Sequence, residues 1–504
     1  MVNGRRILIS TSGSRGDVQP FVALALGLKS AGYTVKIITN CNHAPLVKSF
    51  GVDVFGVSAD AEKVLRENES LRTAMAKGEF TTFASALDEI FEKLFPQCGK
   101  ESLQVWEEFH PDLVIASILD VANNRCIAYA KDVPFVACFL QNSIPTQYEK
   151  SPLNEPDWLP KRCRVMVGFL LSYLISLGDA KKIKIIREEL KVPGSDGLLD
   201  TFLQQMYTMS HPELPPIVGT STTLQAELLD MPEDGKPIFT GPWVINAKEQ
   251  EAQARAGGDL FGTKESTAAL KAFLADGKKP VYMGWGSMIA ISPEYMTRFA
   301  VRVLMKTGHK GIVLGGFAHL AESMLDGEPE LQRYAKDNVL FVDTAAHEAL
   351  FPHCSLLVHH GGMGTTAAAY RSGVPQVVTP VFLDQFVNAD MVTKTGVGFG
   401  LPQFQKCSAE AVCKAVQSCL SDASFSQNAQ EKAAQMRAED GVANAVKAVE
   451  AAFKEVDSGE WRQKQDANKA ILRKLASRRT PSCFSWIYRA CCMSKYNDYH
   501  GWVA

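Results

Sequence analysis

The stretch of sequence that decides the fold is Val358-His359-His360-Gly361-Gly362-Met363-Gly364-Thr365-Thr366, which leads into Ala367-Ala368-Ala369. It predicts a strand that ends in a glycine-rich turn, followed by a helix that starts at the two threonines. The N–H groups of a first helical turn lack intrahelical partners and carry a partial positive charge, so they bind phosphate. His360 and Thr365 add side-chain donors. We therefore expect a phosphate site here, and the alternative is a βα turn whose glycines serve only tight packing.

Short apolar runs alternate with helical patterns on both sides of this stretch. A proline-rich break between about residues 210 and 243 divides the alternation into two series. We therefore expect an α/β protein with two doubly wound parallel sheets that face each other across a cleft. The expected strands are Arg6–Ser10, Thr34–Thr39, Leu113–Ala116, Phe135–Phe139, Val281–Met283, Gly311–Leu314, Val339–Val342, Ser355–Val358 and Gln376–Thr379. The first helix is expected to open at Pro20.

Composition excludes some classes of function. The chain has 504 residues, 46% of them hydrophobic, and a net charge of −2, so no general attraction to nucleic acid is expected. Its 12 cysteines are scattered, which favours reduced thiols and a cytoplasmic protein. The longest apolar run, Val165–Leu177, is too short to span a bilayer.

A second motif, Asp384-Gln385, follows the expected strand after the glycine-rich turn. A carboxylate beside a carboxamide suits recognition of vicinal sugar hydroxyls, because Asp accepts hydrogen bonds and Gln both donates and accepts them. The alternative is that Asp384 caps the following helix.

The loop Thr11–Pro20 after the first strand lacks the GxGxxG pattern, and the second strand ends Ile38-Thr39-Asn40 without an acidic residue. The first domain is therefore a poor NAD or FAD site. Asp17 lies beyond the carboxyl end of the first strand, where it could act as a general base toward an acceptor hydroxyl. The alternative is that Asp17 caps the helix, with Arg15 as a partner, and the two roles are compatible.

Taken together, Gly13–Pro20, His359–Thr366 and Phe382–Gln385 resemble the family 1 glycosyltransferases. The branch most similar is that of the sterol 3-beta-glucosyltransferases and the antibiotic glycosyltransferases. Thr240–Trp243 and Gly284–Met288 resemble two further motifs of that branch, in the expected order. The resemblance covers roughly residues 5–440.

The resemblance implies the GT-B fold, with an acceptor-binding Rossmann-like domain at residues 1–225, a nucleotide-sugar-binding one at 226–455 and a tail at 456–504. It implies inverting transfer without a metal or cofactor, the nucleotide sugar being a substrate. The residues that it assigns to the donor are Ser287, His360, Gly362, Gly364, Thr365, Asp384 and Gln385. Asp17 is the expected base and His43 the second choice. Supporting roles around the phosphate fall to Gly13, Arg15, Gly16 and Thr366.

One segment departs from the family. Relatives usually have Pro-His-Asp-Trp-Leu-Phe-Pro where this chain has Ala346-His347-Glu348-Ala349-Leu350-Phe351-Pro352. The missing Trp and Asp weaken the inference that the donor is UDP-glucose.

The acceptor side carries an apolar helix pattern and the chain ends in an unusual tail. Val165–Ile175 is apolar almost all round with basic flanks, which predicts a buried core helix, with an acceptor wall or a membrane-facing helix as the alternative. The tail combines basic residues with Trp486 and Cys491-Cys492, which suits an interfacial anchor or a loose terminus. Peripheral membrane contact therefore stays open.

These features predict transfer of a hexosyl group, from UDP-glucose, to a hydroxyl of a sterol or other lipid-like acceptor. A non-sterol glycolipid or a secondary metabolite is the rival acceptor. An epimerase-like enzyme and a non-catalytic nucleotide-sugar-binding protein are the rival functions.

Overall fold

The computed structural model describes residues 4–141, 158–224, 236–245, 249–250, 253 and 263–476. The chain divides into two compact units. The first unit combines residues 1–63, 87–244 and 440–504, and the second combines 64–86 with 245–439. None of the helices in the described ranges is long and apolar enough to cross a membrane.

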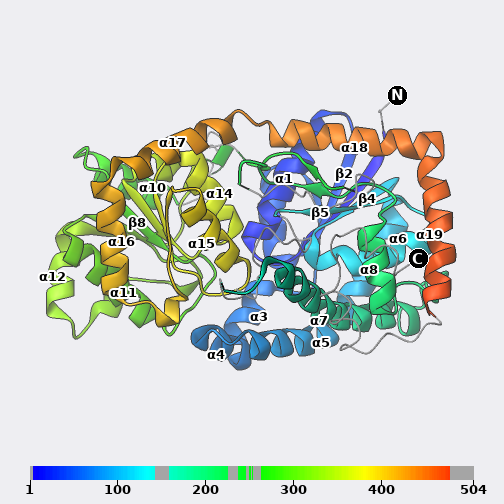
Figure 1. Ribbon diagram of the computed structural model, residues 1–504, viewed down its shortest axis with the longest axis horizontal. Helices are drawn as coiled ribbons and strands as arrows, with labels where there is room; N and C mark the ends of the chain where they lie inside the picture. The colour runs from blue at the N-terminus through cyan, green and yellow to red at the C-terminus, as the bar shows by residue number, and fades with distance from the viewer. Residues whose placement is uncertain are drawn as a thin grey trace. The chain divides into compact units, whose positions relative to one another are not determined.

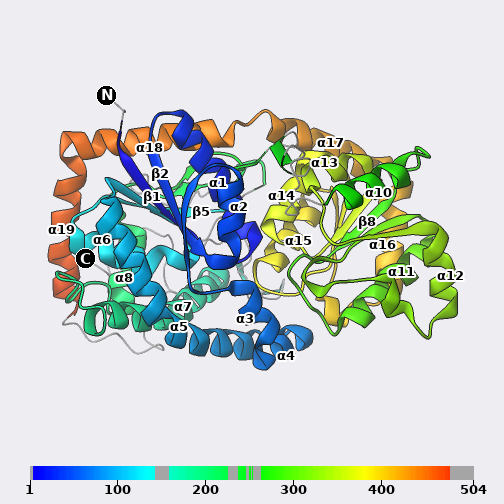
Figure 2. The ribbon, with the colours of Figure 1, turned by 180° about the vertical axis from the view of Figure 1, so that it is seen from behind.

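A seven-stranded sheet with only parallel pairings forms the centre of the first unit (Figures 1 and 2). Its order is β3-β2-β1-β4-β5-β6-β7, so the direction of winding reverses between β1 and β4. The carboxyl ends of β1 and β4 therefore form the topological switch point, where doubly wound sheets bind ligands. The strands are β1 (Arg6–Ser10), β2 (Thr34–Asn40), β3 (Asp53–Val57), β4 (Leu113–Ala116), β5 (Phe135–Phe139), β6 (Ile217–Val218) and β7 (Ile238–Phe239).

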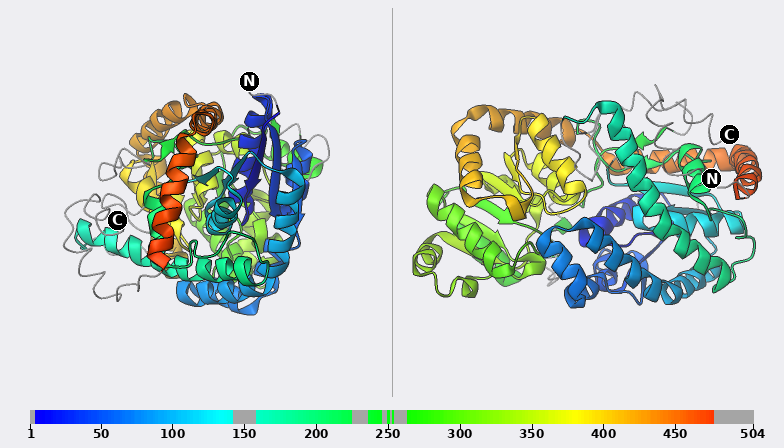
Figure 3. Two further views of the ribbon diagram at one scale, coloured as in Figure 1. Left: turned by 90° about the vertical axis from the view of Figure 1, so that its right-hand side faces the viewer. Right: turned by 60° about the horizontal axis from the view of Figure 1, so that its bottom comes forward.

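Helices cover this sheet, and two of them come from the end of the described chain. They are α1 (Arg15–Ser30), α2 (Ala44–Ser49), α5 (Phe80–Phe109), α6 (Val121–Lys131), α7 (Lys161–Glu188), α8 (Phe202–Ser210), α18 (Gly441–Ser458) and α19 (Glu460–Ala476). α18 lies close against α1, because a Cβ on Gly27 would come within 2.3 Å of Val442. α19 lies along α8 (Figure 3), where Gln204 Nε2 donates to the carbonyl of Leu472 (2.8 Å) and Tyr207 Oη to Asn468 Oδ1 (3.0 Å).

The second unit has a six-stranded sheet, again with only parallel pairings. Its order is β10-β9-β8-β11-β12-β13, so its switch point lies between β8 and β11. The strands are β8 (Val281–Gly284), β9 (Gly311–Leu314), β10 (Val339–Val342), β11 (Leu356–His359), β12 (Gln376–Val378) and β13 (Gly398–Gly400). The prediction of two parallel, doubly wound sheets is confirmed.

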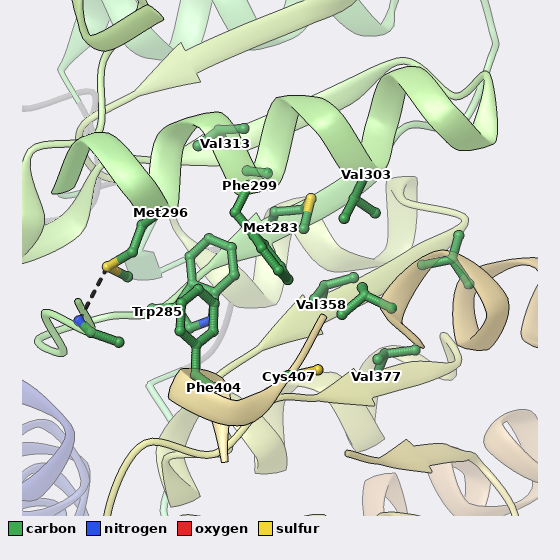
Figure 4. Packing of buried hydrophobic residues seen from close by; sticks show 14 of the residues in the cluster. Met283, Trp285, Met296, Phe299, Val303, Val313, Val358, Val377, Phe404 and Cys407 are labelled. Atoms are coloured by element: carbon green, nitrogen blue, oxygen red, sulfur yellow. Dashed lines mark hydrogen bonds between the residues drawn. The ribbon is translucent and has the colours of Figure 1, made fainter. Parts of the chain in front are cut away.

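The helices of the second unit pack over two main apolar cores, and Figure 4 shows part of the larger one. These helices are α4 (Glu69–Lys77), α10 (Lys264–Leu274), α11 (Pro293–Thr307), α12 (Pro329–Asn338), α13 (His347–Leu350), α14 (Met363–Ser372), α15 (Asp384–Lys394), α16 (Ala409–Ser421) and α17 (Ala423–Arg437). Trp285 is buried at the centre, edge-on to Phe404 at 5.3 Å. α3 (Ala61–Glu67) and α5 each begin in one unit and continue in the other.

Two predicted helix starts are wrong. α1 begins at Arg15 rather than at Pro20, because Ser14 and Asp17 form a capping box ahead of the proline. α14 begins at Met363, two residues before the threonines, with Gly362 as its N-cap. Asp17 therefore lies on the first turn of α1, and Gly364 and Thr365 lie on the first turn of α14, rather than on open loops.

Candidate functional site

The predicted donor residues gather at the switch point of the second sheet. Gly284 of β8 pairs with His359 of β11, and His359 pairs with Val378 of β12. The segments that follow these three strands therefore leave the sheet side by side. They carry Ser287, the turn His360–Thr365 and the loop before α15.

The glycine-rich turn places the start of α14 at this edge. Gly364 and Thr365 occupy the second and third positions of the helix, where N–H groups lack partners within the helix. The hydroxyl of Thr366 donates to the carbonyl of Gly362 (3.0 Å), which braces the turn. Thr366 thus has a structural contact, whereas exposed Gly364 and half-buried Thr365 border open space.

His359 and His360 are both buried but differ in their partners. Gly361 N–H donates to His359 Nδ1 (3.1 Å), which leaves the His359 proton on Nε2, facing Gln376 Oε1 at 3.0 Å. Burial lowers the pKa of His359 to about 4. His359 is therefore a neutral structural residue that fixes the end of β11.

His360 differs from His359, because one of its ring nitrogens has no hydrogen-bond partner. Its Nδ1 is buried without a hydrogen-bond partner, and a buried polar group of this kind usually has a function or a missing ligand. Burial, with the neighbouring His359 and His347, lowers its pKa to about 3, so the ring is neutral near pH 7. A Cβ on Gly362 would meet His360 Nε2 at 2.4 Å, and one on Gly286 would meet Cε1 at 2.9 Å. The imidazole therefore lies between two glycines, and a side chain at either position would displace it.

Ser287 lies on the turn after β8, one residue beyond Gly286. Two hydrogen bonds hold this turn in place: Trp285 Nε1 donates to Thr379 Oγ1 (2.9 Å), and Phe317 N–H donates to the Gly286 carbonyl (3.0 Å). The half-buried serine is thus held on a rigid support beside His360.

Asp384 and Gln385 begin α15, and Leu383 rather than Asp384 is the N-cap residue. Leu383 has φ 49° and ψ −125°, a strained conformation of the kind found at binding sites. Gln385 Oε1 accepts from the N–H groups of Val381 and Phe382 (2.8 and 3.0 Å), so its oxygen is committed to the loop. The Nε2 group of Gln385 is the part that suits an external acceptor.

Asn388 connects this loop to the glycine-rich turn and was not predicted as a site residue. Its Nδ2 donates to the Gly361 carbonyl (2.7 Å) and lies 3.5 Å from Asp384 Oδ2. Asn388 lies four residues after Asp384 on α15, so the helical spacing brings the two side chains together.

The segment that departs from the family forms α13 and the turn after it. Ala349 is half-buried and offers no ring. Glu348 pairs with Arg371 (3.3 Å), and burial raises the pKa of Glu348 while Arg371 opposes the rise. His347 Nε2 lies 3.2 Å from Tyr282 Oη, and its ring stacks on Phe351 at 4.6 Å. The half-buried His347 ring therefore lies on the fully buried Phe351 at the segment where relatives have Trp.

The first unit holds Asp17 at its own switch point. Ser14 donates twice to Asp17 Oδ2, from its N–H (2.7 Å) and its hydroxyl (2.8 Å). Gly13 has φ 120°, and a Cβ there would meet Asp17 Oδ2 at 2.6 Å. Burial raises the pKa of Asp17, and the Ser14 hydrogen bonds oppose the rise. Asp17 is half-buried and stabilises the helix start, which leaves its second oxygen for another contact.

The supporting residues do not form one group. Gly13, Arg15 and Gly16 lie with Asp17 in the first unit, whereas Thr366 lies in the second. Arg15 Nε donates to Gln19 Oε1 (3.0 Å), and Gly16 is exposed. These three residues lie at the start of α1, and their predicted role toward the phosphate stays a prediction.

His43 is buried against the same loop. Its Nε2 lies 3.0 Å from the Gly13 carbonyl, an acceptor that requires the proton on Nε2. Burial lowers the pKa of His43, so the ring is mainly neutral at pH 7. The contact orients the Asp17 loop, which is the structural role usual for a lone buried histidine.

Asp120 is a second carboxylate at this switch point, and the sequence analysis missed it. Its Oδ2 accepts from the hydroxyls of Ser12 (2.9 Å) and Ser117 (3.3 Å), and burial raises its pKa. The signal was available, because in a doubly wound sheet β4 follows β1 in space and Asp120 lies four residues after β4.

Exposed apolar side chains lie on the turn of Asp120 and along α7. Ile118 and Leu119 on its turn are 50% and 40% exposed. Lys182 of α7 contacts the Leu119 carbonyl (3.5 Å), and α7 exposes Leu170, Leu174, Ile175 and Leu177. The core-helix prediction covered Val165–Ile175, where Leu171 is buried but Leu170, Leu174 and Ile175 are exposed, and the fully buried Ile183 and Ile186 lie beyond that segment. Most of the predicted tail anchor, including Cys491-Cys492, lies outside the described residues.

Two family models match the chain. Residues 7–132 match the glycosyltransferase family 28 N-terminal domain, and residues 323–452 match the erythromycin biosynthesis protein CIII-like C-terminal domain. The first match contains Asp17 and Asp120, and the second contains the glycine-rich turn and Asp384-Gln385.

Curated relatives include sterol 3-beta-glucosyltransferases. One from Arabidopsis thaliana is 29% identical over 457 residues, which is 88% of this chain and 65% of that protein. One from Aspergillus fumigatus is 26% identical over 451 residues, covering 88% of this chain and 29% of that protein. The chain thus spans about two thirds or less of the length of these relatives.

Solved glycosyltransferase structures share the fold. The kitacinnamycin glycosyltransferase gives a TM-score of 0.60 at 19% identity, covering 89% of this chain and 98% of that one. The calicheamicin glycosyltransferase CalG4 gives 0.56 at 17% identity, covering 90% and 99%. The chain therefore belongs to the glycosyltransferases of the GT-B fold, with a family 28 N-terminal domain, a CIII-like C-terminal domain and a distant relationship to the sterol 3-beta-glucosyltransferases.

Proposed function

We propose that this protein is an inverting glycosyltransferase that transfers glucose from UDP-glucose to a hydroxyl of a sterol or another lipid-like acceptor. The observation that carries the proposal is the buried, unpartnered Nδ1 of His360 beside the first turn of α14. A diphosphate would accept hydrogen bonds from the imidazole and from the free N–H groups of the turn.

The second unit's residues would divide the donor between them. His360, Gly364, Thr365 and Ser287 would meet the charge that develops on the departing diphosphate, and Asp384 with Gln385 Nε2 would meet sugar hydroxyls. Preorganised donors of this kind contribute about 3–4 kcal/mol each to transition-state stabilisation in oxyanion holes. Their rigid support, through Thr366, Asn388 and Trp285, agrees with that role.

Asp17 would take the proton from the acceptor hydroxyl as the oxygen attacks the anomeric carbon. Its raised pKa strengthens the carboxylate as a base. Ser14 holds one carboxylate oxygen, so the other keeps a fixed direction. His43, which is neutral and engaged with the Gly13 carbonyl, fits a positioning role better than that of a base.

The apolar residues near Asp120 support a lipid-like acceptor. Apolar surface in the first unit is offered by Ile118 and Leu119, on the turn of Asp120, and by the exposed face of α7. An acceptor that partitions into membranes would also bring this face to a bilayer, so peripheral membrane contact forms part of the proposal.

A secondary metabolite and a thymidine diphosphate sugar are the alternative substrates. Solved relatives in fold include SsfS6 of Streptomyces sp. SF2575 and the spinosyn rhamnosyltransferase SpnG, each with thymidine diphosphate. Ala349, where sterol enzymes usually have Trp, leaves the choice of base less constrained.

Product analysis tests the proposal. Purified protein is offered UDP-glucose or dTDP-glucose with sterols, a mixed lipid extract and polyketide alcohols, and products are identified by mass. A sterol glucoside formed from UDP-glucose is the expected product. Transfer to polyketides from dTDP-glucose alone would show that the proposed donor and acceptor are wrong and that the proposed glycosyl transfer is right. Donor conversion without an acceptor would indicate an epimerase-like enzyme.

A further inference from the structure

A segment of the N-terminal half of the chain belongs to the second unit. Residues 64–86, which comprise α4 and the start of α5, cluster with residues 245–439; we call them the anchor segment. Met75 is only 1% exposed in the same apolar core as Trp285 and Phe382. The segment is therefore an integral part of the donor-side unit and not a surface addition.

Hydrogen bonds to three main-chain carbonyls near the end of α4 hold the anchor segment in place. Ile291 N–H donates to the Ala76 carbonyl (3.1 Å), and Gln405 Nε2 donates to the Met75 carbonyl (2.9 Å). Gln403 Nε2 donates to the Gly78 carbonyl (3.2 Å). Gly78 is the left-handed C-cap of α4, and a Cβ there would meet Gln403 Nε2 at 2.2 Å. These contacts leave little freedom for the end of α4.

The same Gln403 also holds the loop that leads to the sugar motif. Its Nε2 donates to the Val381 carbonyl (3.1 Å), while Val381 N–H donates to Gln385 Oε1 (2.8 Å). One amide group thus connects Gly78, Val381 and Gln385 in a chain of hydrogen bonds. Phe83 of the anchor segment adds a ring contact with Phe382 at 5.1 Å.

This loop needs external support. Leu383 between Phe382 and Asp384 has a positive φ, a conformation that surrounding contacts must hold in place. The glycine-rich turn, by contrast, is braced by Thr366 and Asn388. Asn388 links the two through Gly361 and Asp384, but Gln403 hydrogen-bonds to the loop before Asp384, so this loop has an additional support of its own.

We propose that Gln403 and Phe83 are positioning residues that set the Asp384-Gln385 loop for the sugar part of the donor and leave diphosphate binding unaffected. The inference rests on the proposed function, since it takes Asp384 and Gln385 as sugar contacts. Selectivity for the sugar then depends on residues 64–86, which come from the half of the chain that precedes the donor domain.

The test compares how Gln403→Met changes binding of UDP-glucose and of UDP, measured by calorimetry. Methionine keeps the length and removes both donated hydrogen bonds. We expect UDP-glucose to bind about tenfold more weakly and UDP to change by less than about twofold, because each hydrogen bond contributes about 0.5–1.5 kcal/mol. The Michaelis constant for the donor should rise while the constant for the acceptor stays the same. Phe83→Leu should change the same quantities in the same direction.

Gln405→Met is the matched control. Gln405 donates the same kind of hydrogen bond to the anchor segment but has no contact with Val381. It should lower the thermal midpoint by less than Gln403→Met, since it removes one of these hydrogen bonds rather than two, and it should leave the ratio of the two affinities at the wild-type value. The inference is overturned if Gln403→Met weakens the binding of UDP-glucose and of UDP equally, or if it changes neither affinity. Wild-type protein that binds neither ligand, nor the dTDP pair, would instead overturn the proposed function and the inference with it.

Discussion

Replacing Gly362 by alanine should displace the His360 imidazole and weaken binding of UDP. The backbone tolerates the change, because Gly362 has φ −59° and ψ 140°, which any residue adopts. The new Cβ, however, would lie 2.4 Å from His360 Nε2, whereas carbon contacts are optimal at about 3.5–4.0 Å. The ring must therefore move by about 1 Å, and Gly286 on its other side restricts the movement.

The expected magnitude follows from the contact that is lost. A hydrogen bond to a charged group contributes about 1.5–3 kcal/mol, which corresponds to roughly 10- to 150-fold in affinity. Overpacking should also lower the free energy of unfolding by about 1–3 kcal/mol. Calorimetric titration of UDP and urea unfolding measure the two effects separately.

A double-mutant cycle identifies the cause. If Gly362→Ala acts through the His360 ring, it should have almost no further effect on UDP affinity in a His360→Ala background. Additive losses in the double variant would refute the reasoning, because they would show that Gly362 and His360 affect the ligand independently. An unchanged affinity in Gly362→Ala alone would refute it equally.

Three further predictions concern the first unit. Ser14→Ala removes a hydrogen bond that lowers the pKa of Asp17, so the acid limb of the pH profile of kcat/KM should move to higher pH; an unmoved limb would show that another group titrates. Leu174→Ser, at a side chain 47% exposed, should slow transfer to a sterol in vesicles but not to a detergent-dispersed one, while Ile238→Ser changes neither; equal rates in vesicles would argue against the exposed face of α7 as a lipid contact. Asn468→Leu leaves Tyr207 Oη and the His211 carbonyl without their partner, so the free energy of unfolding should fall by about 2–3 kcal/mol in urea titration, and a loss below about 0.5 kcal/mol would contradict the role given to α19.

The strands that could be predicted are those whose apolar runs are continuous. β1, β4, β5, β9 and β10 have the predicted bounds, since buried parallel strands need apolar residues on both faces. β3 (Asp53–Val57) and β13 (Gly398–Gly400) were not predicted, because their sequences begin with Asp or contain two glycines. Their place in a sheet comes from pairing with β2 and β12, which the local sequence does not encode.

The site shows the same division between local and distant information. The glycine-rich turn and Asp384-Gln385 are compact motifs, and their residues do gather at one switch point. Asn388 and Gln403 act through partners far away in the chain, so no short pattern marks them, whereas Asp120 could have been found from its position after β4. Likewise, no local signal indicates that residues 64–86 pack with the second unit.

The central claim is that Asp17 deprotonates the acceptor while other residues hold the donor. The most direct test measures Asp17→Asn, an isosteric change, for turnover with UDP-glucose and a sterol and for binding of UDP-glucose. The account predicts loss of turnover by at least about a hundredfold, with donor affinity within about twofold of the wild-type value. Turnover near the wild-type rate, or loss of donor binding together with turnover, would contradict it.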